Sequence, residues 1–422
     1  MAGRCARRPR GILLLLVEKG RSWLGWSWVA PASPPRVVFQ LEGKRNTLLA
    51  SCYKKMSTPT KVFWKCIPKE ILAHIFSYLP FEDRHMAFSI CQCWAEAVSF
   101  HSVWRFTEIS CDTESMDNEC MLERLHQYLC RIKHLKVVLD QSRQLYRRHA
   151  AQILDILNWQ SHRLRALCIE CYGVGPYYYS GQDILQNFRS LFENTGKIDL
   201  HYIDLRQTPY TLDNGMIQLI ATSSPNLHTL LINNHPSGVI ILRPKTITEV
   251  LRVCPKLSVL GVYHVLLSED VFRELLKPNR RPFRFLDIYC DSLDHNIPER
   301  LWSALTEKHP QLRVGLEFDL MVPAWEMTTF LMPNIPIVAL QFNTFMYTSR
   351  QIQYVTDSYN RTLERLVFDT TPSDDLNDLL IELAKRCVCL KEIHCYCAVS
   401  QAVIDAFLLN CPGLIRYTLS MH

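Results

Sequence analysis

The chain has 422 residues, 48% of them hydrophobic and 21% charged, so it can bury a large core and can hold more than one structural unit. Its formal net charge of +6 is concentrated near the amino terminus, because residues 1–55 carry 11 Lys and Arg against two Glu, and the remainder carries 36 basic and 39 acidic residues. A nucleic-acid-binding domain needs a basic surface on its folded body, so this near-neutral remainder argues against that class.

The cysteines and the hydropathy argue against two further classes. The 17 cysteines are spaced too irregularly for the disulfide framework of a small secreted domain, which favours reduced thiols in the cytoplasm or the nucleus. The longest apolar run covers residues 11–17 and is closed by Glu18 and Lys19. It is shorter than the roughly 18 residues that a membrane span requires. We therefore expect no membrane partner.

The amino-terminal segment is predicted to lie outside the folded protein. Residues 1–60 are interpreted as a disordered or spurious extension, with Met56 as the working start. The Arg-rich beginning and the apolar run at 11–17 also suit a signal or transit peptide, although no clear small-residue cleavage site follows. A targeting segment therefore stays open as the alternative.

The next stretch, residues 67–106, is predicted to form helices with more apolar surface than they can cover. Pro68 suits a first helical position, Pro80 ends the helix, and between them lie apolar residues at helical spacing: Ile71, Leu72, Ile75, Phe76 and Leu79. A second segment follows Glu82 and Asp83, and one of its faces carries Met86, Ile90, Trp94 and Val98. A unit of about 43 residues rarely builds a sufficient core alone, so its remaining apolar faces need a partner.

These residues resemble a known family. The pattern I-P-x-E-I-L-x-x-I-F-x-Y-L-P-x-x-D-R from Ile67, then C-x-x-W from Cys91 and V-W-R from Val103, is similar to the F-box. The resemblance implies an all-helical domain over 64–109 that inserts into the Skp adaptor of cullin-RING ubiquitin ligases. It implies adaptor contacts at Ile67, Pro68, Ile71, Leu72, Ile75, Phe76, Tyr78, Leu79, Cys91 and Trp94, with Trp104 bracing the last turn. The alternative is an ordinary helical hairpin packed on the rest of the chain.

Beyond residue 130 the chain repeats the frame L-x-x-L-x-φ, in which φ is apolar. Clear copies begin at Leu164, Leu227, Leu257, Phe283, Ile337, Leu363, Leu390 and Leu414, and looser copies begin at Leu135, Ile198 and Leu312. From Leu164 onward the starts are 24 to 34 residues apart, about the period of a leucine-rich repeat. The predicted fold class is therefore α/β: an all-helical F-box followed over 110–422 by an irregular leucine-rich-repeat solenoid, with parallel strands concave and helices convex.

Local signals support one strand and one helix in each repeat. The stretch from Thr246 to Glu249 reads as a capping box, and the helix it would begin buries Ile247, Val250, Leu251 and Cys254. Pro recurs just before the next strand in SPNL, CPKL, HPQL and CPGL, where it ends the helix. The ninth frame position holds His235, Val265, Asp291 and Ala398 rather than Asn or Cys, so we expect no asparagine ladder.

An F-box followed by such repeats resembles the F-box and leucine-rich-repeat class of substrate receptors. The resemblance implies a non-catalytic subunit that brings a protein substrate to a ubiquitin ligase, reaching cullin and the RING subunit through the adaptor. Proximity and orientation would be its contribution to the reaction. A leucine-rich-repeat interaction scaffold acting outside ubiquitin transfer is the alternative.

Strand alternation gives candidate substrate-binding residues, because the third, fifth and seventh frame positions should face outward on the concave side. These are Tyr263, Phe285, Asp287, Tyr289, Arg365, Asp369, Glu392, His394 and Tyr396. Aromatic and charged residues suit a protein-binding surface, although each position also fits a merely solvated strand residue. The three tyrosines between Gly173 and Gly181 form a second candidate, unless they pack over the repeats.

Zinc is the remaining alternative, because Cys387, Cys389, Cys395 and Cys397 lie near His394. Their spacing matches no common zinc module, and buried cysteine behaves as a small hydrophobe. The sequence shows no nucleophile elbow, phosphate-binding loop or H-E-x-x-H motif. We therefore predict no metal, no cofactor and no catalytic residue.

Overall fold

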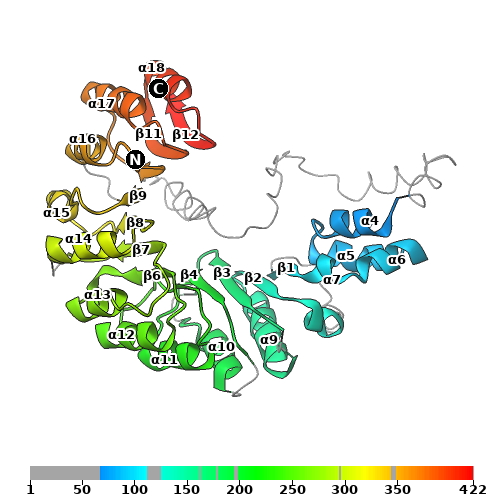
Figure 1. Cartoon of the computed structure of the whole chain (residues 1–422). Helices are drawn as coiled ribbons and strands as arrows, with labels where there is room; N and C mark the ends of the chain where they lie inside the picture. The colour runs from blue at the N-terminus through cyan, green and yellow to red at the C-terminus, as the bar shows by residue number, and fades with distance from the viewer. Residues whose placement is uncertain are drawn as a thin grey trace, which may run out of the picture. The chain divides into compact units, whose positions relative to one another are not determined.

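The computed structural model describes residues 67–111, 125–160, 163–176, 179–193, 198–293, 296–343 and 348–421 (Figure 1). The predicted extension over residues 1–60 lies outside these ranges. The chain divides into two compact units. The first ends at Leu164 and also takes Cys171–Tyr179, and the second holds Arg165–Glu170 and the chain from Ser180 onward.

The described part of the first unit begins with four short helices: α4 (Lys69–Phe76), α5 (Phe81–Phe88), α6 (Gln92–Val98) and α7 (His101–Trp104). Pro68 and Pro80 are the N-caps of α4 and α5, so each proline stands immediately before a helix. The single segment predicted after Asp83 is wrong, because α5 ends at Phe88 and α6 begins only after Cys91. Because of this break, the residues of α6 do not continue the helical face that begins in α5.

Among its described residues the first unit also contains two strands and a long helix. β1 (Phe106–Cys111) and β2 (His134–Asp140) are parallel, and α9 (Gln144–Gln160) follows them, with a 3-10 turn, η2 (Leu129–Arg131), before β2. β1 was not predicted, because it lacks the leucine frame. The signal that could have revealed it is the alternation of Ile109 and Cys111 with the polar residues Glu108 and Ser110. The structure buries Thr107, Ile109 and Cys111 on one face of the strand.

The described residues of the second unit form ten parallel strands, each paired with the next along the chain. They are β3 (Ala166–Tyr172, whose last two residues group with the first unit), β4 (Tyr202–Gln207), β5 (Thr229–Leu231), β6 (Val259–Tyr263), β7 (Phe285–Cys290), β8 (Arg313–Phe318), β9 (Ile337–Phe342), β10 (Arg365–Phe368), β11 (Glu392–Val399) and β12 (Arg416–Met421). Parallel neighbours require a crossover, and a helix supplies each one.

Those helices are α10 (Gln182–Glu193), α11 (Asn214–Ser223), α12 (Pro244–Val253), α13 (Glu269–Leu275, after the turn η3, His264–Leu266), α14 (Glu299–Lys308), α15 (Ala324–Phe330), α16 (Ser349–Ser358), α17 (Asp374–Arg386) and α18 (Gln401–Asn410). Figure 1 shows them as an outer row, with the strands of the same unit along the inside of the curve. The predicted solenoid is confirmed.

The apolar frame forms the core between the strands and the helices. Leu257, Leu260 and Val262 are fully buried, as the pattern predicts. The looser copy assigned to Ile198 is shifted, because the residues that β4 and its approach bury are Leu200, Ile203 and Leu205. That frame therefore begins two residues later than predicted.

Helix ends differ in one place from the prediction. The prolines of SPNL, CPKL, HPQL and CPGL do follow helix ends, since α11, α12, α14 and α18 all stop just before these motifs. The capping box is wrong: α12 begins at Pro244, and its N-cap is Arg243. The hydroxyl of Thr246 instead donates to Asn214 Oδ1 at 2.7 Å, because the preceding repeat offers a half-buried acceptor.

Side chains at the helix C-caps link successive repeats. Ser224 Oγ accepts from the amide of Leu200 at 3.0 Å. Cys254 and Cys411 donate through their thiols to carbonyl groups one repeat earlier, at 3.6 and 3.5 Å. All three side chains are buried. Buried polar groups must be paired, and here the pairing also joins neighbouring repeats.

His309 occupies the same C-cap position and is only 3% exposed. Its Nδ1 accepts from the amide of Phe283 at 3.2 Å, so its Nε2–H donates to the carbonyl of Leu275 at 3.1 Å. Burial lowers the pKa of His309; the Leu275 carbonyl opposes that effect, and Lys308 and Arg280 add to it. The native imidazole is therefore held in its neutral form.

This arrangement predicts a pH dependence of stability. Because the folded pKa of His309 lies below its unfolded value, the unfolded chain binds more protons as the pH falls below about 6.5, and stability is lost, by up to about 1.4 kcal/mol per pH unit for one proton. Urea unfolding between about pH 7 and pH 5 should show a shallower loss for His309→Gln than for the wild type. His101→Gln, at an exposed position, is the control. Equal slopes for the wild type and His309→Gln would contradict the prediction.

Candidate functional site

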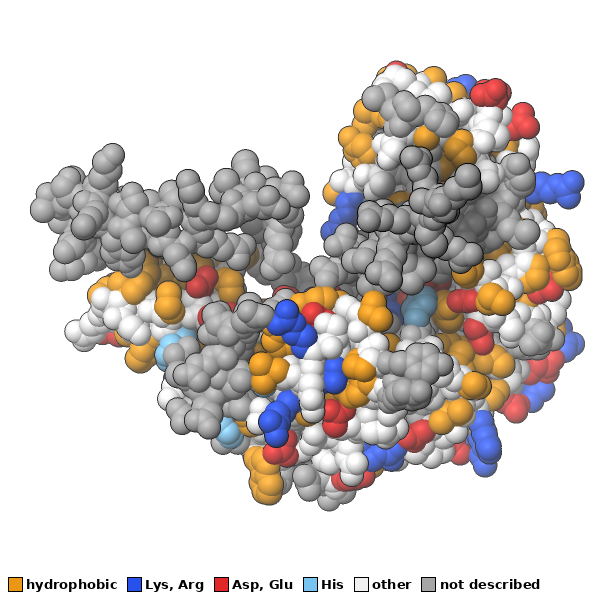
Figure 2. All heavy atoms as spheres, turned by 180° about the vertical axis from the view of Figure 1, so that it is seen from behind, with side chains coloured by type: hydrophobic (Ala, Val, Ile, Leu, Met, Phe, Trp, Pro, Cys, Tyr) orange, Lys and Arg blue, Asp and Glu red, His pale blue; other side chains and the backbone are white. Residues whose placement is uncertain are grey.

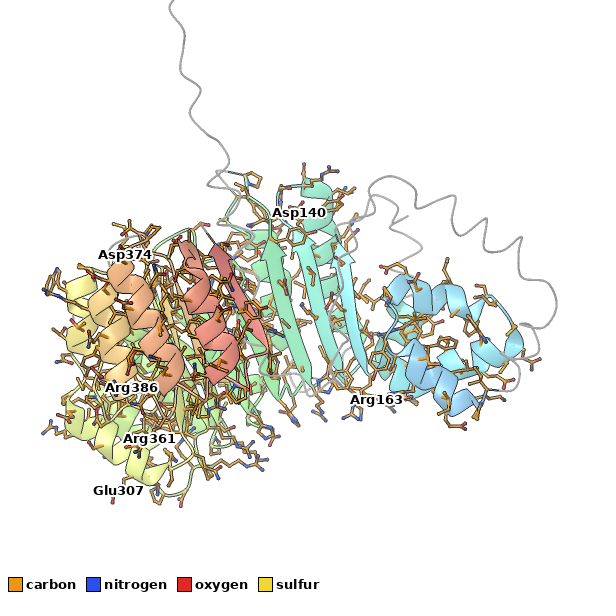
Figure 3. All side chains as sticks on the ribbon, turned by 90° about the horizontal axis from the view of Figure 1, so that it is seen from above. Asp140, Arg163, Glu307, Arg361, Asp374 and Arg386 are labelled. Atoms are coloured by element: carbon orange, nitrogen blue, oxygen red, sulfur yellow. The ribbon has the colours of Figure 1, made fainter. Side chains whose placement is uncertain are left out.

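The folded helices α4 to α7 leave large apolar side chains in contact with solvent. Ile71 is 52% exposed and Met86 is 63% exposed. Figure 2 shows hydrophobic side chains gathered over these helices, at the left of the view. The F-box apolar surface, as we define it, consists of Ile71, Ile75, Tyr78, Met86, Phe88, Ile90 and Phe100, each more than a third exposed. Exposed apolar surface on this scale marks an interaction site.

The predicted adaptor contacts divide into three groups. Pro68, Ile71, Ile75, Tyr78 and Cys91 are exposed; Ile67, Leu79 and Trp94 are half-buried; Leu72, Phe76 and Trp104 are buried. The structure therefore corrects the assignment of Leu72 and Phe76, because side chains 0% and 2% exposed offer no surface to a partner. Phe76 packs on Trp94 instead, with ring centroids 5.0 Å apart.

Four members of the apolar surface were not predicted as contacts: Met86, Phe88, Ile90 and Phe100. Sequence reasoning placed Met86 and Ile90 on a continuous helical face shared with Val98. The break between α5 and α6 separates them, so Met86 and Ile90 face solvent and Val98 is buried. The chain turn decides their exposure, and helical periodicity alone does not report it.

A buried arginine of α5 links the segment after α4 to α7 and to the start of β1. Arg84 is 5% exposed and donates to four main-chain carbonyls, those of Ser77, Leu79, Val103 and Phe106, at 2.7 to 3.0 Å. Two of these carbonyls follow the end of α4, and the other two lie in α7 and at the start of β1. Burial lowers the pKa of Arg84 to about 10, so the side chain stays charged at neutral pH. A single buried cation on α5 thus stabilises the packing of the segment after α4 against α7 and β1.

Trp104 forms the centre of this small core. Its indole Nε1–H donates to the carbonyl of Val98 at 2.7 Å, and its ring stacks on Tyr128 at 3.7 Å with an interplanar angle of 6°. Phe81 packs against its edge at 5.8 Å. The core therefore takes Tyr128 from outside the F-box motif, and this buried support leaves the apolar surface of α4 and α5 facing outward.

The predicted substrate-binding residues are less exposed than expected. Five of them are buried: Tyr263, Asp287, Tyr289, Arg365 and His394. The other four are half-buried: Phe285, Asp369, Glu392 and Tyr396. The prediction that all nine are displayed outward is therefore wrong. Parallel neighbours lie only about 4.8 Å apart, so long side chains in one row cover each other.

Asp287 on β7 is the centre of the first polar network on the strands. Its Oδ2 accepts from Asn233 at 3.1 Å and lies 3.4 Å from Arg206, a side chain that comes from β4 and also pairs with Asp204 at 2.7 Å. Gly261 on β6 makes room for the side chain of Asn233, because a Cβ at position 261 would lie 2.1 Å from Asn233 Oδ1. The network thus spans strands that are not adjacent.

Arg206 affects the pKa values of its two carboxylate partners, Asp204 and Asp287, unequally. Burial raises the pKa of Asp287, and the attraction of Arg206 does not offset it. Burial would also raise the pKa of Asp204, but the charge and hydrogen bonds of Arg206 lower it overall. Asp204, which makes the shorter contact with Arg206, therefore gains more stabilisation of its charged form than Asp287 does. These carboxylates are part of the strand scaffold, where unpaired burial would be costly.

Two further polar networks lie on the strands, one around Glu317 and one around Glu392. Glu317 Oε1 accepts from Asn343 at 2.8 Å and Gln341 at 3.1 Å, and lies 3.4 Å from His235 Nε2. Burial acts to lower the pKa of His235, but Glu317 raises it overall. At the far end of the unit, Glu392 lies 3.1 Å from Arg365 Nε. Cross-strand bonds of this kind use the polar atoms for cohesion between repeats.

The cysteine and histidine cluster considered for zinc is dispersed by the fold. Cys387 caps α17, Cys389 is exposed, and Cys395 lies in β11. His394 Nδ1 is 2.8 Å from Thr418 Oγ1 and its Nε2 is 2.9 Å from Glu392 Oε1. Among the described residues no cluster of three or more metal-ligating side chains occurs.

Over the same ranges, no helix is long and apolar enough to cross a lipid bilayer.

Of the tyrosine loop between Gly173 and Gly181, Tyr177 and Tyr178 lie outside the described residues. Tyr179 is half-buried, and the guanidinium of Arg147 lies 4.3 Å from the centroid of its ring. This contact supports packing for that one residue.

The helical unit with its apolar surface and the array of parallel strands together define an F-box protein with leucine-rich repeats. The F-box-like family matches residues 64–108, and the chain belongs to the F-box and leucine-rich-repeat family. It is 36% identical over 360 residues to F-box/LRR-repeat protein 8 of Homo sapiens, covering 84% of this chain and 95% of that protein. It is 34% identical over 359 residues to F-box/LRR-repeat protein 8 of Mus musculus, with the same coverage.

Among solved structures, the complex of Rad7 and Elc1 from yeast contains a chain that aligns with 88% of this one and 86% of its own length. The TM-score is 0.39 and the sequence identity is 13%.

Proposed function

We propose that this protein is the substrate-recognition subunit of a Skp-cullin-F-box ubiquitin ligase. In this role the F-box apolar surface binds the Skp adaptor, through which cullin and the RING subunit are reached, and the repeats hold a protein substrate. The protein itself performs no chemistry and supplies proximity between substrate and ubiquitin-conjugating enzyme. The exposed apolar surface on a folded F-box unit is the observation that carries the proposal.

The energetics support a stable adaptor complex. Burial of a large aliphatic side chain contributes about 1.5 to 3 kcal/mol, and seven large apolar side chains are available on the surface. These side chains are about half exposed, so several of them together contribute a free energy of the same order as the cost of association, estimated at about 4 to 15 kcal/mol. Because Arg84 and Trp104 fix the helices from within, little ordering is required on binding.

The substrate surface is proposed from the candidate residues that remain accessible. Phe285, Asp369, Glu392 and Tyr396 keep part of their surface, and buried neighbours such as Arg365 hold them in place. The connection from β8 to α15 adds Met321, and the first turn of α15 adds Trp325; they are 80% and 69% exposed. Tryptophan is common at binding hot spots, so both residues belong to the proposed surface.

Proximity labelling in cells, with and without proteasome inhibition, tests the function. The wild type should label the adaptor and cullin, and its substrates should gain label on inhibition. The variant Ile71→Asp/Ile75→Asp should lose the adaptor and cullin, yet label the same substrates regardless of inhibition. If the wild type labels neither adaptor nor cullin and its partners do not respond to inhibition, the scaffold alternative replaces the ligase.

A further inference from the structure

Two cysteine sulfurs on β11 lie in contact. Cys395 Sγ is 3.1 Å from Cys397 Sγ, and both side chains are buried, at 0% and 7% exposed. The pair belongs to no metal-ligating cluster among the described residues, and the proposed function does not use it. The close approach of two thiols separated by one residue therefore needs its own explanation.

An irregularity in the sheet brings the two sulfurs together. Alternate residues of a regular strand are about 6.6 Å apart along the strand. In β11, His394 pairs with Thr418 and Ala398 pairs with Ser420, so three residues of β11 face one residue of β12. Such a bulge bends the strand and re-aims its side chains. The backbone thus places Cys395 and Cys397 closer than regular strand geometry allows.

We propose that Cys395 and Cys397 form a redox modification site, closing reversibly into a disulfide within one strand. A disulfide has sulfurs about 2.05 Å apart, so closure requires the two sulfurs to approach by only about 1 Å. The oxidant is a low-molecular-weight disulfide of the glutathione class. The reaction is thiol–disulfide exchange, which proceeds through a mixed disulfide.

The order of the two steps follows from exposure and hydrogen bonding. Cys397 is the more exposed thiol, and the hydrogen bond from Cys395 lowers its pKa although burial opposes this. The Cys397 thiolate attacks one sulfur of oxidised glutathione and releases one glutathione thiolate. Cys395 then gives up its proton, attacks the Cys397 sulfur and releases the second glutathione. Two protein thiols are oxidised, one glutathione disulfide is reduced, and the two protons pass to the glutathione thiolates.

The modification would act on the residue between the two cysteines. Tyr396 is half-buried and its ring lies nearly parallel to that of His394, 6.3 Å away. Closing the disulfide would fix the backbone on both sides of Tyr396, a proposed substrate residue. An effect on substrate binding rests on the proposed function, whereas formation of the disulfide does not.

The test equilibrates the full-length chain in glutathione buffers of increasing oxidised fraction, blocks the remaining thiols with a maleimide and maps the cysteines by fragment mass spectra. We expect Cys395 and Cys397 to lose maleimide together and to appear as one internal disulfide. Cys395→Ser should trap glutathione on Cys397, because the resolving thiol is gone. Cys411→Ser, which alters a thiol on the same tryptic peptide, should leave the disulfide unchanged.

The proposal is overturned if both thiols still take maleimide in the most oxidising buffer, or if either cysteine pairs elsewhere. Urea midpoints establish whether each variant is folded, and the fragment spectra of the wild type decide the result without any variant. Adaptor binding by the oxidised and reduced chain is measured in parallel. Loss of adaptor binding in both states would count against the proposed function and leave the disulfide assignment intact.

Discussion

Replacing Ile71 and Ile75 with aspartate should abolish binding of the purified Skp adaptor without unfolding the protein. Both residues lie one turn apart on α4 and are 52% and 41% exposed, so they support little of the protein's own core. About half of each side chain remains to be buried, so each loses roughly 0.7 to 1.5 kcal/mol of burial in the complex, and two carboxylates must also be desolvated. The affinity should fall by at least about 100-fold, since 1.4 kcal/mol corresponds to a factor of ten.

Isothermal titration calorimetry with the full-length chain provides the measurement. Leu145→Asp is the matched control, because Leu145 is an apolar residue of the first unit with 49% exposure, outside the F-box apolar surface. That variant should bind like the wild type. Unchanged affinity in the Ile71→Asp/Ile75→Asp variant would remove α4 from the adaptor interface.

Arg84→Met should destabilise the F-box helices by about 3 to 4 kcal/mol. The substitution keeps much of the side-chain volume but leaves the carbonyl groups of Ser77, Leu79, Val103 and Phe106 without their donor. A buried acceptor left unpaired costs about 1 to 3 kcal/mol, and relaxation toward water recovers part of the sum. This is a large loss for one residue.

Hydrogen exchange of the α4 to α7 amides measures this loss locally, because buried helices exchange through opening. Exchange should accelerate by about two to three orders of magnitude. Arg105→Met, at an exposed arginine of the same unit, should leave exchange unchanged. Wild-type protection in Arg84→Met would show that the four hydrogen bonds contribute little. In contrast, Ile71→Asp/Ile75→Asp should lose adaptor binding with its amide protection retained.

Much of the architecture was predictable because its signals are local. The apolar frame, exemplified by Leu257, Leu260 and Val262, recurs at a short spacing, and in four repeats a proline after the helix marks the next strand. A strand too short to bury its face must stack on a neighbour, so repetition itself predicts a solenoid. β1 escaped prediction because pairing with β2, rather than a repeated motif, makes it a strand.

The candidate sites were predicted only in part, because exposure depends on neighbours distant in the sequence. The resemblance to the F-box implied contacts at both Ile71 and Leu72, yet one is exposed and the other is fully buried. Similarly, strand alternation identified Asp287 as outward-facing, but Arg206 from three strands away covers it. Alternation determines which face of a sheet a residue occupies, while the side chains of the other strands determine whether solvent reaches it.

By itself, the sequence determined the alternation of strand and helix in the repeats, the repeat period and the excess of apolar residues over 67–106, because these depend on spacings of a few residues. The tertiary structure decided which of those residues remain exposed, why Arg84 is buried and how Cys395 comes to touch Cys397. Each of these depends on where a helix breaks or how two strands pair in register. Such geometry is a balance among contacts between distant segments, and no local spacing encodes it.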